Sequence, residues 1–233
     1  MKKFVLAASA AMAAAMIPGA AHAGNPDGKL QIKLLGTGVL PDGSLKKVKY
    51  VDPDLLDVLL TVSPADQFDT KANDNVVPTV AIEYFFTPNV SVETICCLTQ
   101  HDVDGANGLA GTELVSNAQV IPATFTLKYH FTDAPFKPYV GVGPTYFLWV
   151  KDESGATTKA LGADGQKMDD EFGFVLQAGV DFPINDQGLG LSVDAKRYFL
   201  DQTAHWYASG TEVLRTEHKL DPWVVSVGLT YRM

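Results

Sequence analysis

Cysteine is scarce in this sequence, and its placement excludes several classes of protein. The 233 residues contain two cysteines, Cys96 and Cys97, which are adjacent. They therefore form neither a disulfide framework nor a CxxC redox or zinc motif. On a strand, neighbouring side chains point to opposite faces, so we expect two small packed residues; a strained vicinal disulfide is the alternative.

Catalytic motifs are also missing. The chain has no GxSxG or HExxH sequence, and its histidines (His22 apart) are scattered at His101, His130, His205 and His218. We therefore predict no enzyme activity, no metal centre and no cofactor. A barrel lipase with a site assembled from distant strands is the remaining enzymatic alternative, but no serine is distinguished for that role.

Positive charge and long apolar segments are both limited. The chain has 18 Lys and Arg against 27 Asp and Glu, a formal charge of -9, which argues against nucleic-acid binding. After the first residues, no segment approaches the run of about 20 apolar residues that a membrane helix needs. Hydropathy alone would suggest a soluble protein, but barrel strands conceal their lipid-facing side in alternation.

The N-terminal segment has the three parts of a secretory signal. Lys2 and Lys3 precede the apolar stretch Phe4–Ile17, and Ala21-His22-Ala23 is a small-x-small cleavage site. We predict a cleaved signal peptide at residues 1–23 and one domain at residues 24–233. Loss of the two lysines would change the formal charge from -9 to -11.

Alternation of apolar and polar residues dominates the rest of the chain. In IPATFTLKYHF, Ile121 to Phe131 place apolar side chains on one face and Thr124, Thr126, Lys128 and His130 on the other. The same pattern predicts eight strands: Lys29–Val39, Thr79–Phe86, Val90–Cys97, Ile121–Thr132, Lys137–Val150, Glu171–Phe182, Leu189–Leu200 and Trp223–Met233.

The connections between these strands alternate strictly between long and short. The long ones are 40–78, 98–120, 151–170 and 201–222; the short ones are 87–89, 133–136 and 183–188. Long external loops and short periplasmic turns are typical of an outer-membrane barrel. We therefore predict an all-β fold, an eight-stranded antiparallel transmembrane β-barrel with up-and-down meander topology. A soluble lipocalin-type barrel rarely shows this asymmetry.

The two faces of the predicted strands differ in charge. One face, represented by Phe125, Leu176 and Val227, carries essentially no charge and is rich in aromatic residues. This set is too large for the inside of eight strands, where only tapered side chains fit. We therefore expect the apolar face to contact lipid and the ionisable face to be enclosed.

Two glutamates are expected to meet inside the barrel. Pairing about the turn at Thr87-Pro88-Asn89 sets Glu83 opposite Glu93, and carboxylates this close need cations or a shared proton. Lys128, Lys196 and Arg232 could supply that charge. We interpret the inward ionisable residues as a charged plug at the turn end, with a proton or ion path as the alternative. The predicted plug is Glu83, Glu93, Lys128, Asp181, Asp194, Lys196 and Arg232.

Toward the long loops the inward positions become apolar. A cup with apolar walls above a charged floor would favour small hydrophobic solutes over ions. A packed upper core with no cavity is an equally good interpretation of the sequence. The predicted cup residues are Leu35, Val39, Ile95, Cys97, Phe147, Trp149, Val175 and Val224.

The first long loop contains a helix signal, VDPDLLDVLL. Asp52 can cap a helix that has Pro53 at its first position and Asp54 in its first turn. Such a helix could lie over the cup as a lid, or it could be ordinary loop packing.

Several motifs together resemble the OmpW family of outer-membrane proteins over essentially the whole mature chain. They are NVSVET at 89–94, IPATFTLKYHF at 121–131, FKPYVGVGPTYF at 136–147, QAGVDFPIN at 177–185 and LDPWVVSVGLTYRM at 220–233. The resemblance implies an eight-stranded barrel with a narrow hydrophobic lumen and a role in uptake of small hydrophobic molecules. Relatives of the AlkL type pass alkanes, and some members serve as colicin receptors.

The predicted function is a narrow hydrophobic channel in the Gram-negative outer membrane for passive uptake of small hydrophobic molecules. The alternative is a structural or surface-interaction barrel, with a receptor or adhesion role and no transport. The expected partners are outer-membrane lipid and small hydrophobic molecules, with no nucleic acid. The sequence defines neither the solute nor an oligomeric state.

Overall fold

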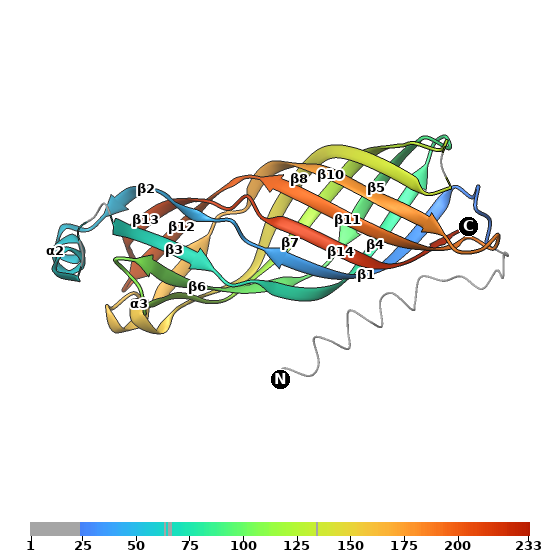
Figure 1. Cartoon of the computed structure of the whole chain (residues 1–233). Helices are drawn as coiled ribbons and strands as arrows, with labels where there is room; N and C mark the ends of the chain where they lie inside the picture. Colours follow the sequence, from blue (N-terminus) through green and yellow to red (C-terminus); the bar gives the residue numbers. More distant parts are fainter. Residues whose placement is uncertain (1–23, 63, 65–66, 134) are drawn as a thin grey trace.

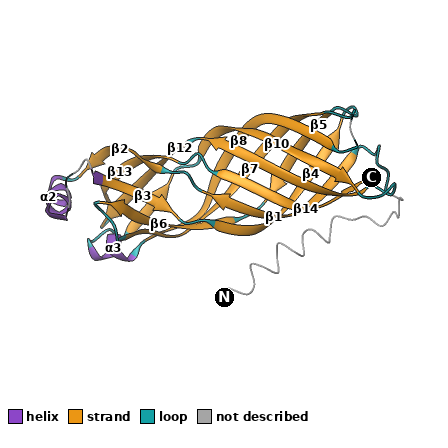
Figure 2. Cartoon of the chain, viewed as in Figure 1, coloured by secondary structure: helices purple, strands orange, loops and turns teal. Residues whose placement is uncertain are grey.

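The chain folds as one elongated β-structure (Figures 1 and 2). The computed structural model describes residues 24–62, 64, 67–133 and 135–233. The predicted signal peptide, residues 1–23, lies outside the described residues. No helix in the described part of the chain is long and apolar enough to cross a membrane.

Eight strands form one closed barrel, and both ends of the described chain lie beside it. Neighbouring strands are antiparallel, and the β7–β8 pairing closes the ring. In order around the barrel, the strands are β1 (Leu30–Leu40), β4 (Asn75–Phe85), β5 (Val90–Cys96), β7 (Glu113–His130), β8 (Lys137–Ser154), β10 (Glu171–Pro183), β11 (Leu189–Phe199) and β14 (Trp223–Arg232). Each barrel strand pairs with the next one along the chain, so the predicted up-and-down meander is confirmed.

The two faces of the barrel are arranged as the alternation predicts. Phe125, Leu176 and Val227 project outward and are 55%, 48% and 58% exposed, whereas Glu83 and Lys128 are buried inside. Rings such as Tyr84, Tyr129 and Phe182 are exposed near the short-turn ends of their strands, where an aromatic girdle meets the membrane boundary. The apolar surface is therefore the lipid-facing one.

The long connections are not loops, which corrects the sequence-based expectation. They contain six further strands: β2 (Ser44–Val51), β3 (Phe68–Ala72), β6 (Thr99–Asn107), β9 (Gly165–Met168), β12 (Asp201–Ala208) and β13 (Thr211–Lys219). β7 and β8 also extend beyond the predicted limits to pair with these strands or with each other. Figure 1 shows that this external part continues the barrel away from the C-terminus.

Local pairing explains the external strands. β12 and β13 form a hairpin whose turn residues, Ser209 and Gly210, have φ angles of 50° and 81°, as a two-residue type I′ turn requires. β13 then pairs with β2, and β12 with β9, to give a second sheet. These strands are short and their registers shift at Trp206/Tyr207 and twice along β13, which weakens the period-2 signal in the sequence.

Two helices lie in the external part. α2 (Pro53–Val62) begins where the sequence predicts, with Asp52 Oδ1 accepting a hydrogen bond of 3.0 Å from the backbone N–H of Asp54. α2 lies at the end of the molecule farthest from the barrel (Figure 1), so it does not lie directly over the cup. α3 (Ala156–Ala160) packs beside β7.

Candidate lumenal site

A buried ion network fills the turn end of the barrel. Glu83 and Glu93 are directly opposite each other on β4 and β5. Lys128 Nζ lies 2.9 Å from a carboxylate oxygen of each, and Lys33 Nζ lies 3.1 Å from Glu83 and 3.2 Å from Glu93. Two lysines therefore neutralise the two facing carboxylates.

The network continues across the lumen. Lys196 Nζ lies 3.1 Å from Glu93 and 2.6 Å from Asp194, which also accepts a hydrogen bond of 2.8 Å from the Tyr139 hydroxyl. Gln177 donates to both Glu93 and Asp194. Because these groups come from β5, β8, β10 and β11 and meet at one level, the interior there is filled by side chains.

The buried charges of this floor balance. Among the described residues, its cations are Lys33, Lys128, Lys196 and Arg232, and its anions are Glu83, Glu93, Asp181 and Asp194. A buried carboxylate is stable only when it is paired and hydrogen-bonded. Three of the cations form ion pairs with these anions, and with Arg232 the four charges of each sign leave the floor little net charge with which to attract an ion.

All seven predicted plug residues lie inside the barrel, but one does not act as expected. Arg232 does not pair with Glu83 or Glu93: its guanidinium lies 3.6 Å from the ring centroid of Phe85 and its Nε donates to the Gly28 carbonyl at 2.7 Å. Lys33 occupies the position that was expected of Arg232, in contact with both glutamates. Lys33 lies on the polar face of β1, and alternation alone would have included it.

Three further residues belong to the floor: alternation placed His130 on the enclosed face without assigning it to the plug, and Ser91 and Tyr139 were not identified. His130 Nε2 and the Ser91 hydroxyl lie 2.8 and 2.5 Å from Glu83 Oε1, and the Tyr139 ring lies 3.7 Å below Lys128 Nζ. Their inward positions follow from alternation on β5, β7 and β8. Uncharged or weakly basic side chains carry no signal that distinguishes them from ordinary barrel lining.

A layer of hydroxyl groups lies above the floor. Thr37 and Ser226 are 2.9 Å apart, Thr124 and Thr145 are 2.8 Å apart, and the buried Tyr198 hydroxyl is 3.4 Å from Thr124. The Thr37–Ser226 and Thr124–Thr145 pairs join neighbouring strands, whereas Tyr198 on β11 and Thr124 on β7 are on strands that do not pair. Leu35 lies between Lys33 and Thr37 on the inward face of β1, so apolar residues occur on both sides of this layer.

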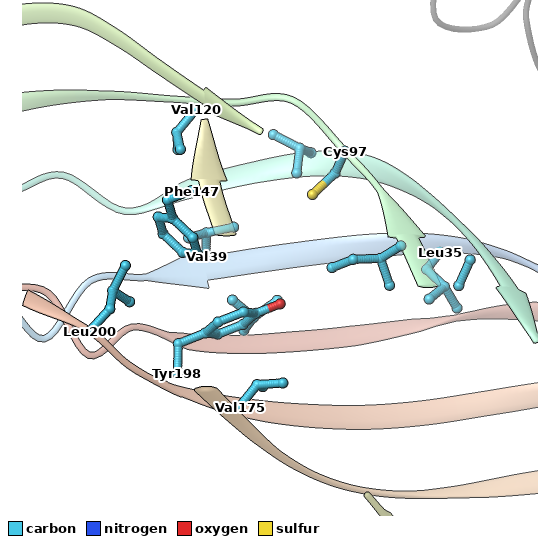
Figure 3. Close-up of a cluster of buried hydrophobic side chains, with 12 residues drawn as sticks. Leu35, Val39, Cys97, Val120, Phe147, Val175, Tyr198 and Leu200 are labelled. Atoms are coloured by element: carbon cyan, nitrogen blue, oxygen red, sulfur yellow. The ribbon is translucent and has the colours of Figure 1, made fainter. Parts of the chain in front are cut away.

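The apolar cup residues form one cluster (Figure 3). Leu35, Val39, Ile95, Cys97, Phe147, Val175 and Val224 are all buried in it, and Trp149 packs against it. Sequence reasoning missed further members, Val77, Ala81, Val120, Tyr198 and Leu200. Trp149 is oriented by its indole Nε1, which donates to Gln202 Oε1 at 2.7 Å.

The cup is partly hollow. A cavity of about 100 Å³ has an almost wholly apolar lining, space for roughly three water molecules at the ~30 Å³ that each occupies in the liquid. Six of the eight predicted cup residues line it: Val39, Ile95, Cys97, Phe147, Trp149 and Val224. Leu35 and Val175 lie below and are packed. The lower cup therefore resembles the packed alternative, and the upper cup the hollow one.

The two cysteines behave as an alternating pair on a strand. Both are free thiols; Cys97 is buried in the cup wall and Cys96 is exposed on the outward face. The vicinal-disulfide alternative is therefore wrong, and the expectation that both residues are packed holds only for Cys97.

The cavity reaches the barrel wall at a gap in the backbone pairing. The last β1–β14 pair is Leu40 with Trp223, and the next pair on these chains, Ser44 with Lys219, belongs to β2 and β13. Pro41, Gly43, Leu220 and Pro222 lie between the two pairs and line the cavity. We call segments 41–43 and 220–222 the seam. The two prolines have no N–H to donate to a ladder.

Comparisons with known proteins agree on one family. The model of the OmpW family matches residues 26–233. An uncharacterised outer-membrane protein of Sinorhizobium fredii, y4mB, is 32% identical over 207 residues, which cover 87% of this chain and 79% of that protein. Outer membrane protein W of Vibrio cholerae is 26% identical over 171 residues, 71% of this chain and 77% of its own length.

Solved structures share the fold. The outer membrane protein OprG from Pseudomonas aeruginosa superposes with a TM-score of 0.73 at 23% identity, covering 89% of this chain and 97% of OprG. The outer membrane protein AlkL, determined in lipid bilayers, superposes with a TM-score of 0.66 at 19% identity, covering 92% of this chain and 94% of AlkL. At these identities the likeness concerns the fold.

Proposed function

The chain belongs to the OmpW family of Gram-negative outer-membrane proteins, and from that premise we propose that its barrel is a passive channel for small hydrophobic molecules. The observation that carries the proposal is the apolar cavity in the cup, closed below by a charge-balanced floor. An apolar cavity favours a hydrophobic solute because burying apolar surface releases roughly 25 cal/mol per Å².

The floor supports selectivity against ions. Lys33, Lys128 and Glu93 are nearly inaccessible and are held in mutual contact. An ion passing this level would have to separate them, and breaking a buried pair costs about 3–5 kcal/mol. A solute that enters the cup therefore has no low-energy route straight down the axis.

We propose that the solute leaves sideways through the seam. The seam lies beside the cavity, and the backbone hydrogen bonds of residues 220 and 222 go to Leu200 and Tyr198 rather than across to residues 41–43. Opening it would break none of the β1–β14 or β2–β13 pairs. A hydrophobic solute would then reach the outward apolar surface close to Leu40 and Trp223.

Uptake by intact cells tests the channel. Gram-negative cells that express the chain should take up naphthalene faster than vector cells, and Phe147→Asp or Trp149→Asp should lower the rate to the vector level because a charge would occupy the apolar cavity. Phe147→Leu is the matched control that keeps the wall apolar. Equal rates for Phe147→Asp and Phe147→Leu, at equal amounts of folded barrel, would refute the proposal.

A reversible cross-link tests the sideways exit. A Cβ placed on Gly43 lies 3.7 Å from Leu220 Cα, and because it also lies 2.9 Å from the Lys219 carbonyl oxygen the backbone at the seam must move to admit it. A disulfide between Gly43→Cys and Leu220→Cys is then within reach, in a Cys96→Ala/Cys97→Ala background. Oxidation should stop naphthalene uptake and reductant should restore it. Uptake that is unaffected by oxidation would exclude the seam.

A surface-interaction barrel is the second candidate. It is favoured by the external position of α2 and by the exposure of Val58 and Leu60, which are 45% and 47% exposed. Such a barrel would show no uptake above vector cells, and Phe147→Asp would leave its binding to a partner unchanged. We also propose that residues 1–23 are a signal peptide and that residues 24–233 form the barrel domain.

A further inference from the structure

Arg197 is a cation on the otherwise apolar outward face of β11. Leu191 and Val193 share this face and are 41% and 44% exposed, whereas the Arg197 side chain is 18% exposed. A charged side chain on the lipid-facing surface of a barrel costs free energy, and the cost is lower near the membrane boundary. The position of Arg197 therefore has to be explained by its contacts.

The guanidinium group of Arg197 contacts an acid and a ring. Its Nη2 lies 2.8 Å from Asp42 Oδ2, and its Cζ lies 5.2 Å from the ring centroid of Trp223. A cation within about 6 Å of an indole ring is attracted to it. In the described part of the chain, Asp42 is the single carboxylate that pairs with Arg197.

These contacts cross the seam. Asp42 belongs to segment 41–43, whereas Arg197 is paired in register with Trp223, which directly follows segment 220–222. The backbone N–H of Tyr198 also donates to the Pro222 carbonyl at 3.1 Å, which ties that segment to β11. The ion pair therefore joins the two sides of the seam, where the described residues form no backbone hydrogen bond between segments 41–43 and 220–222.

Other exposed ion pairs of the molecule do not have this position. Lys46 on β2 lies 2.9 Å from Glu217 on β13, across strands that a backbone ladder already joins. Lys151 and Glu153 lie on the same strand, β8. Loss of either pair would open no gap. Loss of the Asp42–Arg197 pair leaves the seam held only by the ladders at its two ends.

We propose that the Asp42–Arg197 ion pair is the latch of the sideways exit, which holds the seam closed beside the cup cavity and breaks each time a solute leaves. The inference rests on the proposed function and names the residues that control its exit. The Asp42 side chain is 66% exposed, and a pair that water reaches is weak enough to open often. A hydrophobic solute offers neither charge a partner, so the latch closes again behind it.

Naphthalene uptake by intact cells tests the latch. Asp42→Asn removes the charge and keeps the shape, and should raise the initial rate roughly two- to fivefold, as expected when one partly exposed ion pair is lost. Arg197→Gln should have the same effect, and the double variant should be no faster than either single variant. Effects of the two single changes that multiply in the double variant would overturn the latch.

Two controls accompany the uptake experiment. Asp42→Glu keeps the carboxylate and should restore most of the slow rate. Lys151→Gln breaks an exposed pair away from the seam and should leave uptake unchanged. Rates are compared at equal amounts of folded barrel.

Thiol labelling gives a readout that does not depend on transport. Leu220 is half-buried, belongs to the seam and packs against the cup. In liposomes, Leu220→Cys in the Cys96→Ala/Cys97→Ala background should react with N-ethylmaleimide faster when Asp42→Asn is added, by the same factor as uptake. Val175→Cys, at a fully buried position of β10, should react at an unchanged rate. Equal acceleration at both positions would mean that the whole barrel loosens, which would overturn the latch.

The two readouts separate failure of this inference from failure of the proposed function. Uptake that exceeds that of vector cells but is unchanged by Asp42→Asn refutes the latch alone. No uptake by any variant, with faster labelling of Leu220→Cys in Asp42→Asn, refutes transport and keeps the ion pair as the closure of the seam. Unchanged labelling of Leu220→Cys overturns the latch in either case.

Discussion

The membrane-spanning barrel and the external part enclose different interiors. The barrel is closed by eight antiparallel ladders, and its lower interior is filled by paired charges. The external part consists of sheets that meet at side-chain contacts, such as the Leu45 N–H to Asp69 Oδ1 bond of 3.0 Å and the Met168 N–H to Asp152 Oδ2 bond of 2.5 Å. Its interior is apolar and contains a second cavity of about 470 Å³, whereas the cup cavity lies where the external part joins the barrel.

The difference shows how stability and access are divided along the molecule. A closed ladder satisfies every backbone group, which lipid demands, and a filled floor blocks flow. Outside the membrane, water can satisfy strand edges, so the sheets need not be fully joined. Each prediction below concerns a variant or a condition that alters either the barrel or the external part.

The largest effect is expected in the floor. Glu93→Gln removes the charge that faces Lys33, Lys128 and Lys196 and leaves one excess buried cation. Loss of one partner from a buried ion pair costs about 3–5 kcal/mol. Urea unfolding in lipid vesicles should show this loss, and Glu93→Gln/Lys196→Met should recover part of it. A change below about 1 kcal/mol would mean that the floor is not a tight network.

A charge on the lipid-facing surface should have the next largest effect. Val227 is near the middle of β14 and 58% exposed, so Val227→Arg should destabilise the barrel by roughly 2–4 kcal/mol. Val58→Arg, on the exposed face of the external helix α2, should cost close to nothing. The same urea unfolding experiment measures both. Equal costs would contradict the division between lipid-facing and water-facing surfaces.

Acid should loosen the external part before the barrel. Burial lowers the pKa of His218 from 6.5 to about 4. The unfolded state therefore binds a proton that the folded state does not between these values, and stability falls as pH decreases from about 7 to 4, by up to about 3 kcal/mol. Hydrogen exchange of β13 amides should accelerate over this range.

His218→Asn is the control for the acid effect, because it removes the titrating ring. The acceleration should then be smaller, with a residual slope from His101, whose pKa is also lowered by burial. If the pH dependence of β13 exchange is unchanged in His218→Asn, the histidine is not responsible for it.

The smallest effect is expected at an exposed ion pair of the external part. Lys151 and Glu153 are 2.8 Å apart, with side chains 44% and 43% exposed. Surface pairs contribute about 0–1 kcal/mol because water screens them, so Lys151→Gln should change the unfolding free energy by no more than that. A loss of unfolding free energy as large as that of Glu93→Gln would contradict the expected difference between buried ion pairs of the floor and exposed ion pairs of the surface.

The sequence alone determined the barrel and its sidedness. Alternation has a period of two residues and is a local property, so it identified the outward Phe125 face, the inward positions of Glu83 and Lys128, and the pairing of Glu83 with Glu93 across a short turn. It also placed the start of α2. None of these inferences requires knowledge of what lies across the lumen.

Only the tertiary structure decided which inward groups meet. Lys33, rather than Arg232, reaches the two glutamates, because the tilt and stagger of the closed strands set the height of each side chain in the barrel. The external strands and the two cavities depend on short, register-shifted pairings between distant segments. Such pairings leave no periodic trace in the sequence, because the contacts that stabilise them join residues far apart in the chain.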